Sequence, residues 1–268
     1  MSEVTRELFF ERVTSLAKIL AIANQKGGVG KTTTSVNLAA CLAAKKQRVL
    51  LVDSDPQGNA SSGFGIQKSE LAATIYDVLL GGKTAAEAIV STEFHVDVLP
   101  ANINLAGAEV ELVAAISRET RLKKALAAVR DNYDFILIDC PPSLGLLTLN
   151  ALAAADAVLM PIQCEFYALE GVAQLMNTVS LVRDNLNPDL AVEGVVLTMY
   201  DSRTKLAQDV VREVQENFGD VVYQTLIPRN VRLSEAPSYG QPVIYYDKHS
   251  KGAQVYKELA KEMLKRER

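Results

Sequence analysis

The chain has 268 residues, of which 49% are hydrophobic and 22% charged, with 15 glycines and no tryptophan. This composition is typical of a globular protein and excludes a disordered, collagen-like or coiled-coil chain. Lysine and arginine total 28 against 32 aspartate and glutamate, a net charge of −4, so the molecule as a whole is not a basic nucleic-acid binder. The charge is uneven, because residues 1–201 carry 16 basic and 23 acidic side chains and residues 202–268 carry 12 and 9. A polyanion would therefore meet the C-terminal quarter.

Cysteine usage and the N-terminus indicate a cytoplasmic chain. Cys41, Cys140 and Cys164 lie far apart without a C-x-x-C spacing, so neither a disulfide framework nor a zinc site is predicted. No apolar run reaches the roughly 18 residues that span a bilayer, and the N-terminus lacks the pattern of a secretory signal. We expect an N-terminal extension over residues 1–17, packed on the domain or disordered, followed by a single domain over residues 18–268.

Short apolar runs alternate with longer segments of helical periodicity from residue 18 onward. The predicted strands are residues 18–24, 48–53, 96–99, 135–139, 157–162, 192–198 and 221–226. The predicted helices are residues 32–45, 122–132, 168–185, 206–218 and 253–265. Because most of these strands are apolar on both faces, they belong in a mostly parallel sheet covered by helices on each side. The sequence therefore predicts a three-layer α/β fold.

The most informative segment is NQKGGVGKTT at residues 24–33, which follows a predicted strand and opens a predicted helix. Its glycines allow a tight turn with inward N–H groups, and the helix start adds partial positive charge, so the segment is suited to bind phosphates. Lys31 would contact the β and γ phosphates, Thr32 would present its hydroxyl to Mg²⁺, and Thr33 would contact the α phosphate. The candidate nucleotide-binding residues here are Lys26, Gly27, Gly28, Val29, Gly30, Lys31, Thr32 and Thr33.

One position departs from the general phosphate-loop pattern G-x-x-x-x-G-K-[ST], because Gln25 stands where that pattern has glycine. An additional lysine, Lys26, follows it. The run K-G-G-V-G-K-T resembles the deviant Walker A motif of the ParA/MinD family of ATPases. The resemblance implies a P-loop NTPase fold, and it implies that Lys26 reaches across a dimer interface to the phosphates of the other subunit. A second cation beside the triphosphate would favour a face-to-face dimer of nucleotide-loaded subunits.

Two predicted strands end in carboxylates, at the sheet edge where open α/β sheets bind ligands. Asp53 and Asp55 lie in DSDPQGN, and Asp139 ends FILID in a Walker B arrangement, where an acid accepts from a magnesium-bound water. The family resemblance implies that Asp55 positions the attacking water, whereas Asp53 is equally consistent with a role in the structure of the loop. The predicted catalytic residues are Lys26, Lys31 and Asp55. The predicted metal-site residues are Thr32 and Asp139.

The segment IPRNVRLSEAP at residues 227–237 closely resembles the adenine-binding segment of ParA/Soj proteins. The resemblance implies that Pro228 packs against the adenine ring and that Asn230 hydrogen-bonds its edge. No Asn-Lys-x-Asp guanine motif occurs in the chain. Apart from the resemblance, nothing in the sequence decides between ATP and GTP, and the resemblance implies ATP with Mg²⁺ as the ligand.

The net-positive C-terminal quarter contains the cations that we expect to bind DNA, which are Arg203, Lys205, Arg229, Arg232, Lys248 and Lys251. In the family that the chain resembles, arginines matching Arg203 and Arg232 contribute to sequence-nonspecific DNA binding by the dimer. A few cations per subunit bind phosphates weakly, and a dimer doubles them, so dimerisation would switch on the affinity for DNA. The alternative is that these are ordinary solvated surface charges.

The resemblance to Soj-type ParA proteins covers nearly all the chain from residue 18. It implies a cytoplasmic, nucleoid-associated ATPase that binds ATP and Mg²⁺, dimerises around the nucleotide, binds nonspecific double-stranded DNA and is reset by slow hydrolysis that a ParB-type partner stimulates. The main alternative is a MinD-like membrane-cycling ATPase, but the last predicted helix, with acidic residues among its lysines, is typical of a helix docked on the core, so no membrane partner is expected. An iron–sulfur reductase would need differently placed cysteines. A binding module without turnover is excluded only if Asp55 acts as implied.

Overall fold

The computed structural model describes residues 16–166 and 169–267. The predicted N-terminal extension lies almost wholly outside these residues. The described residues contain a seven-stranded sheet in the order β3-β4-β2-β5-β1-β6-β7, parallel except for the antiparallel pair of β3 and β4. The strands are β1 (Lys18–Ile22), β2 (Val49–Asp53), β3 (Val90–Ser91), β4 (Val96–Leu99), β5 (Phe135–Asp139), β6 (Ala157–Gln163) and β7 (Ala191–Thr198). The predicted mostly parallel α/β sheet is confirmed.

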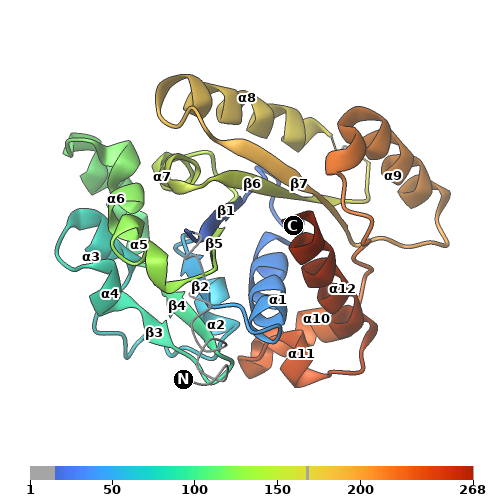
Figure 1. Cartoon of the computed structure of the whole chain (residues 1–268), viewed down its shortest axis with the longest axis horizontal. Coiled ribbons are helices and arrows are strands. Elements are labelled where there is room, and N and C mark those ends of the chain that lie inside the picture. Colours follow the sequence, from blue (N-terminus) through green and yellow to red (C-terminus); the bar gives the residue numbers. More distant parts are fainter. Residues whose placement is uncertain (1–15, 167–168, 268) are drawn as a thin grey trace, which may run out of the picture.

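Helices cover both faces of the sheet, which gives three layers (Figure 1). One face is covered by α1 (Lys31–Ala43), α2 (Asn59–Ser62), α10 (Val231–Glu235), α11 (Val243–Tyr246) and α12 (Lys251–Arg266). The other is covered by α3 (Ile75–Leu80), α4 (Ala85–Ala88), α5 (Leu105–Glu111), α6 (Arg121–Ala127), α7 (Leu146–Ala154), α8 (Glu170–Asn185) and α9 (Lys205–Phe218). Because each central strand packs apolar side chains on both sides, every residue of β2 and β5 is buried.

The register of the central strands brings several strand ends to one edge. Asp139, at the end of β5, is level with Ile22 of β1 and with Asp53 of β2. The phosphate-loop segment therefore begins beside Asp53 and Asp139, as the sequence predicts for the carboxyl edge of a parallel sheet. The sheet positions the candidate site before any side-chain contact is considered.

The predicted strand over residues 221–226 is wrong. The structure has a short 3-10 helix at Gly219–Val221 and then a single bridge between Val222 and Val195. The Tyr223 N–H donates to the Val195 carbonyl of β7 at 2.8 Å, but the N–H groups of Gln224 and Thr225 donate to the Glu262 carboxylate of α12, at 2.8 and 3.0 Å. A side chain thus takes the place of a sheet partner, which the apolar pattern of the segment cannot reveal.

Helix ends also differ from the predicted ones. The predicted helix over residues 122–132 divides into α6, which ends at Ala127, and a 3-10 turn at Arg130–Asn132. The Arg130 side chain there donates to the Ala17 carbonyl at 3.0 Å and pairs with Asp156 at 2.7 Å. The turn therefore joins the residue before β1 to the residue before the neighbouring strand β6.

Gly240 lies at a close approach of two backbone segments on the α1 side. Its φ is +63°, and a Cβ there would lie 2.7 Å from the Cα of Gly65. Gly219 has a similar φ of +56° but open space around it. We expect Gly240→Ala to lower the free energy of unfolding by about 2–4 kcal/mol and Gly219→Ala by about 1 kcal/mol, because only the first adds a backbone overlap to the left-handed strain. Urea denaturation of both variants measures this, and equal losses would contradict it.

Candidate nucleotide-binding site

The phosphate loop occupies residues 23–30, between β1 and α1. Gly28 and Gly30 have φ values of +75° and +89°, which side chains with a Cβ rarely adopt. A Cβ at Gly27 or Gly28 would meet nothing within 4 Å, so the loop backbone faces open space. Gly30 is the N-cap of α1 and has no side-chain capping bond, which leaves the N–H groups of the first helical turn available to an anion.

Lys31 is the buried cation of this loop. Its side chain is 7% exposed, and its Nζ donates to the Lys26 carbonyl at 3.2 Å across the loop. Burial lowers the pKa of Lys31, while the carboxylates of Asp139 and Asp55 act in the opposite direction. In the part of the chain that the structure describes, Lys31 makes no ion pair, so its charge is stabilised incompletely.

Lys26 lies at the rim of the same loop and is held through its backbone. Its N–H donates to Asn24 Oδ1 at 3.0 Å, and Asn24 Nδ2 donates to the Pro161 carbonyl of β6 at 2.8 Å. Gly171 of α8 approaches closely, since a Cβ there would lie 3.1 Å from Asn24 Oδ1 and 3.5 Å from Lys26 Cβ. The backbone of Lys26 is therefore fixed, while its side chain stays partly exposed.

Asp139 lies at the centre of the strand ends and is fully buried. Its Oδ1 accepts from Ser35 Oγ at 2.7 Å, whereas Oδ2 is buried without a hydrogen-bond partner. Burial raises the pKa of Asp139 to about 7, the Asp53 carboxylate adds to the rise, and the hydroxyls of Ser35 and Thr32 oppose it. A buried carboxyl oxygen without a partner beside a threonine hydroxyl fits a hydrated magnesium ion, which prefers oxygen ligands.

The two aspartates of the β2 loop have different surroundings. Asp53 is fully buried and accepts from the Ser61 N–H and hydroxyl, both at 2.7 Å, and from the Asp55 N–H at 3.3 Å. Burial nevertheless raises the pKa of Asp53 to about 6. Asp55 is partly exposed and accepts from the Gln57 N–H at 2.9 Å. These contacts support a structural role for Asp53 and leave the predicted role in hydrolysis to Asp55.

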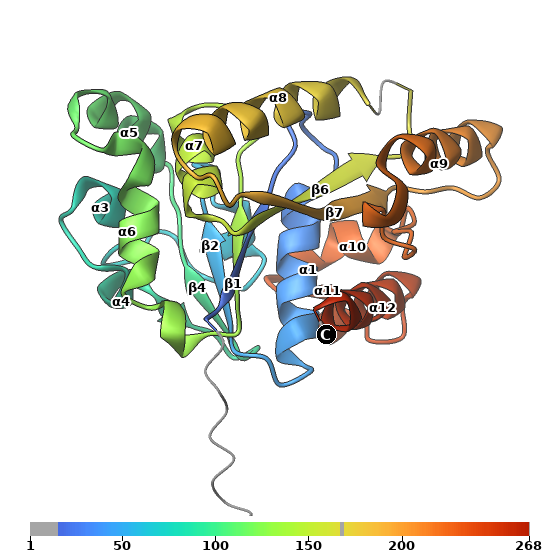
Figure 2. The same ribbon diagram turned by 45° about the horizontal axis from the view of Figure 1, so that its top comes forward.

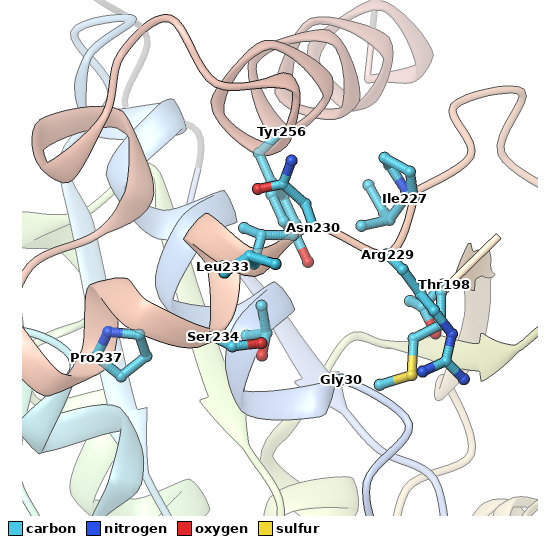
Figure 3. Close-up of a pocket in the computed structure, with 13 residues that line it drawn as sticks. Gly30, Thr198, Ile227, Arg229, Asn230, Leu233, Ser234, Pro237 and Tyr256 are labelled. Carbon is cyan, nitrogen blue, oxygen red and sulfur yellow. The ribbon is translucent and has the colours of Figure 1, made fainter. Parts of the chain in front are cut away.

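A cavity of about 480 Å³ continues from the phosphate loop toward α10 and α12. Figure 3 shows Asn230 and Tyr256 close together on its far side, with Gly30 and Thr198 at the loop end. Asn230 Oδ1 accepts from the Arg232 N–H at 3.0 Å, so the amide Nδ2 remains as the donor for a ligand. Pro228 and Thr33 also line the cavity, which therefore joins the predicted base-binding and phosphate-binding residues in one space.

The six predicted DNA-binding cations fall into two groups. The arginines are paired with acids: Arg203 with Asp201 at 2.7 Å, Arg232 with Glu235 at 2.7 Å and Asp247 at 3.3 Å, and Arg229 with Glu165. Among the described residues, no ion pair involves Lys205, Lys248 or Lys251. These cations lie at the beginnings of α9, α10 and α12, which are on the same side of the molecule (Figure 2).

The site also contains residues that the sequence analysis did not identify. They are Asn24 and Ser35, which support Lys26 and Asp139, and Thr198, Met199 and Tyr256, which line the cavity. Ser35 could have been found, because it lies one helical turn after Thr32 and points to the same side of α1. Tyr256 is 222 residues from Thr34, whose hydroxyl lies 3.2 Å from the tyrosine oxygen, and no local pattern predicts such a contact.

Comparison with known proteins places the chain in a family. A family model described as an AAA domain matches residues 17–192. The sporulation initiation inhibitor protein Soj of Bacillus subtilis is 62% identical over 249 residues, which cover 92% of this chain and 98% of that protein. The chain belongs to the Soj/ParA family of chromosome-partitioning proteins. Another member, the chromosome partitioning protein ParA of Myxococcus xanthus, is 55% identical over 254 residues, 94% of this chain and 90% of its own.

Solved structures agree with the fold of this Soj/ParA chain. A Mycobacterium smegmatis protein described as cobyrinic acid a,c-diamide synthase, with bound ADP and magnesium, is 42% identical with a TM-score of 0.82, over 93% of this chain and 95% of its own. The cell division ATPase MinD of Pyrococcus furiosus is 29% identical with a TM-score of 0.76, over 93% and 99%. In the described residues no helix has the length and apolar content needed to cross a bilayer.

Asp139→Asn tests how the buried carboxyl group of Asp139 affects the free energy of unfolding at different pH values. Because burial raises the folded-state pKa from 3.8 to about 7, the folded protein keeps a proton that the unfolded chain has already released. This contribution to stability is unchanged below about pH 4 and falls as the pH rises toward 7. In EDTA without nucleotide, the stability of the wild type relative to the variant should drop by roughly 2–4 kcal/mol between about pH 4 and pH 8. Guanidinium unfolding measures this, and parallel pH profiles would contradict it.

Proposed function

We propose that the chain is an ATPase that binds ATP with Mg²⁺ as a monomer and dimerises around the nucleotide. The observation that carries this proposal is the arrangement at the strand ends. An incompletely stabilised lysine, Lys31, and a carboxyl oxygen of Asp139 without a partner lie beside the phosphate loop. Gly30 at the end of this loop lines a cavity that Asn230 also lines. A magnesium-bound triphosphate would bring an anion to the lysine and a cation to the carboxylate.

Each part of the site has a separate task in this proposal. The N–H groups of the phosphate loop and the first turn of α1 hold the phosphates, and Lys31 neutralises the β and γ groups. Thr32 and Asp139 would hold the metal, which supplies charge neutralisation at the transferred phosphate when it is bound. Pro228 and the Asn230 amide would hold the adenine. Asp55, exposed enough to reach water, would orient the attacking molecule.

In this proposal, Lys26 makes dimerisation depend on the negative charge of the bound nucleotide. Its backbone is fixed by Asn24 and by the approach of α8, and its side chain is partly exposed. In a face-to-face dimer this ammonium group would reach the phosphates of the other subunit. Two triphosphate-loaded surfaces repel each other, and a cation contributed by each subunit reverses the sign of that interaction.

Lys26→Ala should leave ATP binding nearly intact and abolish the ATP-dependent dimer, because only the contact to the second subunit is lost. Light scattering coupled to size exclusion, with and without ATP and Mg²⁺, measures this. Lys45→Ala is the control, since Lys45 is an exposed lysine beyond the end of α1. A Lys26→Ala protein that dimerises with ATP would remove the trans role of this residue.

Asp55→Ala should bind ATP and dimerise but lose at least about 90% of its phosphate release, because orientation of the water by a carboxylate accounts for roughly 10²–10⁴-fold in rate. Asp55→Asn keeps the size of the side chain and its contact to the Gln57 N–H, so it separates loop structure from catalysis. A phosphate-release assay on preformed dimers is the measurement. Normal turnover in either variant would argue that hydrolysis does not depend on this carboxylate.

DNA binding by the dimer is the second part of the proposal. Lys205, Lys248 and Lys251 are exposed, and the arginines nearby would exchange carboxylate partners for DNA phosphates. Each arginine already has a carboxylate partner, so a DNA phosphate binds it less favourably than it would bind an unpaired cation. One subunit alone would therefore bind DNA weakly. Two subunits would double the phosphate contacts, and hydrolysis stimulated by a ParB-type protein would release the nucleoid DNA.

Arg232→Glu should weaken binding of the ATP-bound dimer to unrelated DNA sequences equally, and wild-type affinity should fall steeply with salt as counterions are released. Fluorescence anisotropy with two duplexes of different sequence and about 50 to 200 mM salt measures this. Lys123→Glu, on the opposite face in α6, is the charge-matched control. Salt-independent binding, or an equal effect of the two reversals, would contradict the assignment of this surface.

Membrane cycling of the MinD type receives no support from the last helix. Val255, Leu259 and Met263 of α12, the apolar positions that a lipid surface would need, are buried against the α1 side of the sheet. Its exposed positions carry lysines, Gln254, Glu258 and Arg266. Exposing this helix to lipid would require it to leave the core.

A further inference from the structure

The last residue of β7, Thr198, connects the two halves of the nucleotide cavity. Its side chain is 2% exposed, and its hydroxyl lies 2.8 Å from the Val29 carbonyl of the phosphate loop and 3.2 Å from the Ile162 carbonyl of β6. The single hydroxyl proton is therefore shared between the loop and the neighbouring strand. No other side chain among the described residues donates to the Val29 carbonyl.

Fixing the Val29 carbonyl also fixes the next N–H group. The peptide unit is planar and trans, so the Gly30 N–H points away from the carbonyl that Thr198 holds. Gly30 itself has a φ of +89°, and a Cβ there would lie 3.7 Å from Thr198 Cγ2, so the threonine also neighbours the loop at this residue. The orientation of a phosphate-binding N–H thus depends on the end of β7.

The next two residues hold the other half of the cavity. Met199 has a φ of +52°, a conformation that non-glycine residues adopt at an energetic cost. This turn lets the Tyr200 N–H donate to the Ile227 carbonyl at 3.0 Å, while the Tyr200 carbonyl accepts from the Arg229 N–H at 3.4 Å. Pro228, the residue between these two contacts, lines the cavity where the base would bind.

We propose that Thr198 and Met199 are positioning residues that set the distance between the phosphate loop and the adenine-binding segment. The proposal rests on the ATP site described above. One short run of three residues touches the loop on one side and residues 227–229 on the other, and both Thr198 and Met199 line the cavity between them. Figure 3 shows Thr198 near the loop end, between Gly30 and the chain that carries Ile227 and Arg229.

This arrangement predicts that a substitution at Thr198 or Met199 lowers the affinity for ATP more than the affinity for a bare phosphate chain. Inorganic tripolyphosphate uses the loop alone, whereas ATP uses the loop and the adenine segment at once. If the spacing between them becomes variable, the gain from binding both ends of one ligand decreases. The ratio of ATP affinity to tripolyphosphate affinity therefore reports the spacing, while a general loss of stability lowers both affinities together.

The experiment is calorimetric titration of the full chain with ATP and with tripolyphosphate, each with Mg²⁺. Thr198→Val removes the shared hydrogen bond at constant shape and should reduce the affinity ratio about tenfold, the equivalent of one buried hydrogen bond. Thr198→Ser keeps the hydroxyl and should retain the ratio within about threefold. Thr92→Val, which removes a hydroxyl that donates to the Val96 carbonyl beside β3, at the edge of the sheet opposite β7, is the control and should leave the ratio unchanged.

Met199→Gly provides a second test if Thr198→Val folds poorly. Glycine adopts the same φ without strain, so the fold should persist, but the turn becomes free to move and the ratio should again decrease. An unchanged ratio in both Thr198→Val and Met199→Gly overturns the proposal, as does equal damage from Thr198→Ser and Thr198→Val. If the wild type binds neither ligand, the proposed ATP site itself fails, which is a separate outcome.

Discussion

Two buried ionisable groups at the sheet edge are the constraint on which the rest of the structure depends. Lys31 is turned back to a loop carbonyl, and Asp139 has one carboxyl oxygen without a hydrogen bond. They interact electrostatically, yet no ion pair joins them in the described part of the chain. Burying charges in this way lowers stability unless a partner satisfies both. A ligand that is anionic at one end and carries a divalent cation meets both needs, so ligand binding and folding stability are coupled at this site.

The sheet holds these two destabilising groups in place. β1, β2 and β5 are level at their carboxyl ends, and Asp53 ties the β2 loop to Ser61 through a pair of short hydrogen bonds. Thr198 and Asn24 join the phosphate loop to β7 and β6. The loop that would bind phosphate is therefore held by buried polar contacts to β6 and β7, and the neighbouring β2 loop is held by those of Asp53. Rigid support of this kind is what electrostatic stabilisation of a transferred phosphate requires.

Local patterns predicted the fold and much of the site because the decisive residues are close in sequence. The glycines, Lys31 and Thr32 lie in one run, and Asp139 ends a strand whose five residues are all apolar except the last. The parallel sheet then brings these segments together without further information. The cavity side of the site could be assigned only by resemblance, since the apolar and polar residues of 227–237 have no periodicity that indicates a ligand.

The features that the sequence did not predict depend on contacts between residues far apart in the chain. The segment at 221–226 has the composition of a strand, but two of its N–H groups donate to the Glu262 carboxylate and not to a strand. Arg229 is an exposed cation by sequence, and its pairing with Glu165, 64 residues away, alters how strongly it can attract a phosphate. Thr198 ends an ordinary buried strand, and only the folded chain places its hydroxyl on the phosphate loop. Each case involves a polar side chain whose partner depends on the tertiary structure.

The most direct test of the account is the affinity of the full chain for ATP with Mg²⁺ and with EDTA, measured beside GTP with Mg²⁺. If Lys31 and Asp139 are completed by a magnesium-bound triphosphate and Asn230 contacts adenine, ATP should bind at least about tenfold more tightly with the metal than without it, and more tightly than GTP. Equal ATP affinity in EDTA, or no preference for ATP over GTP, would contradict the central claim about this site.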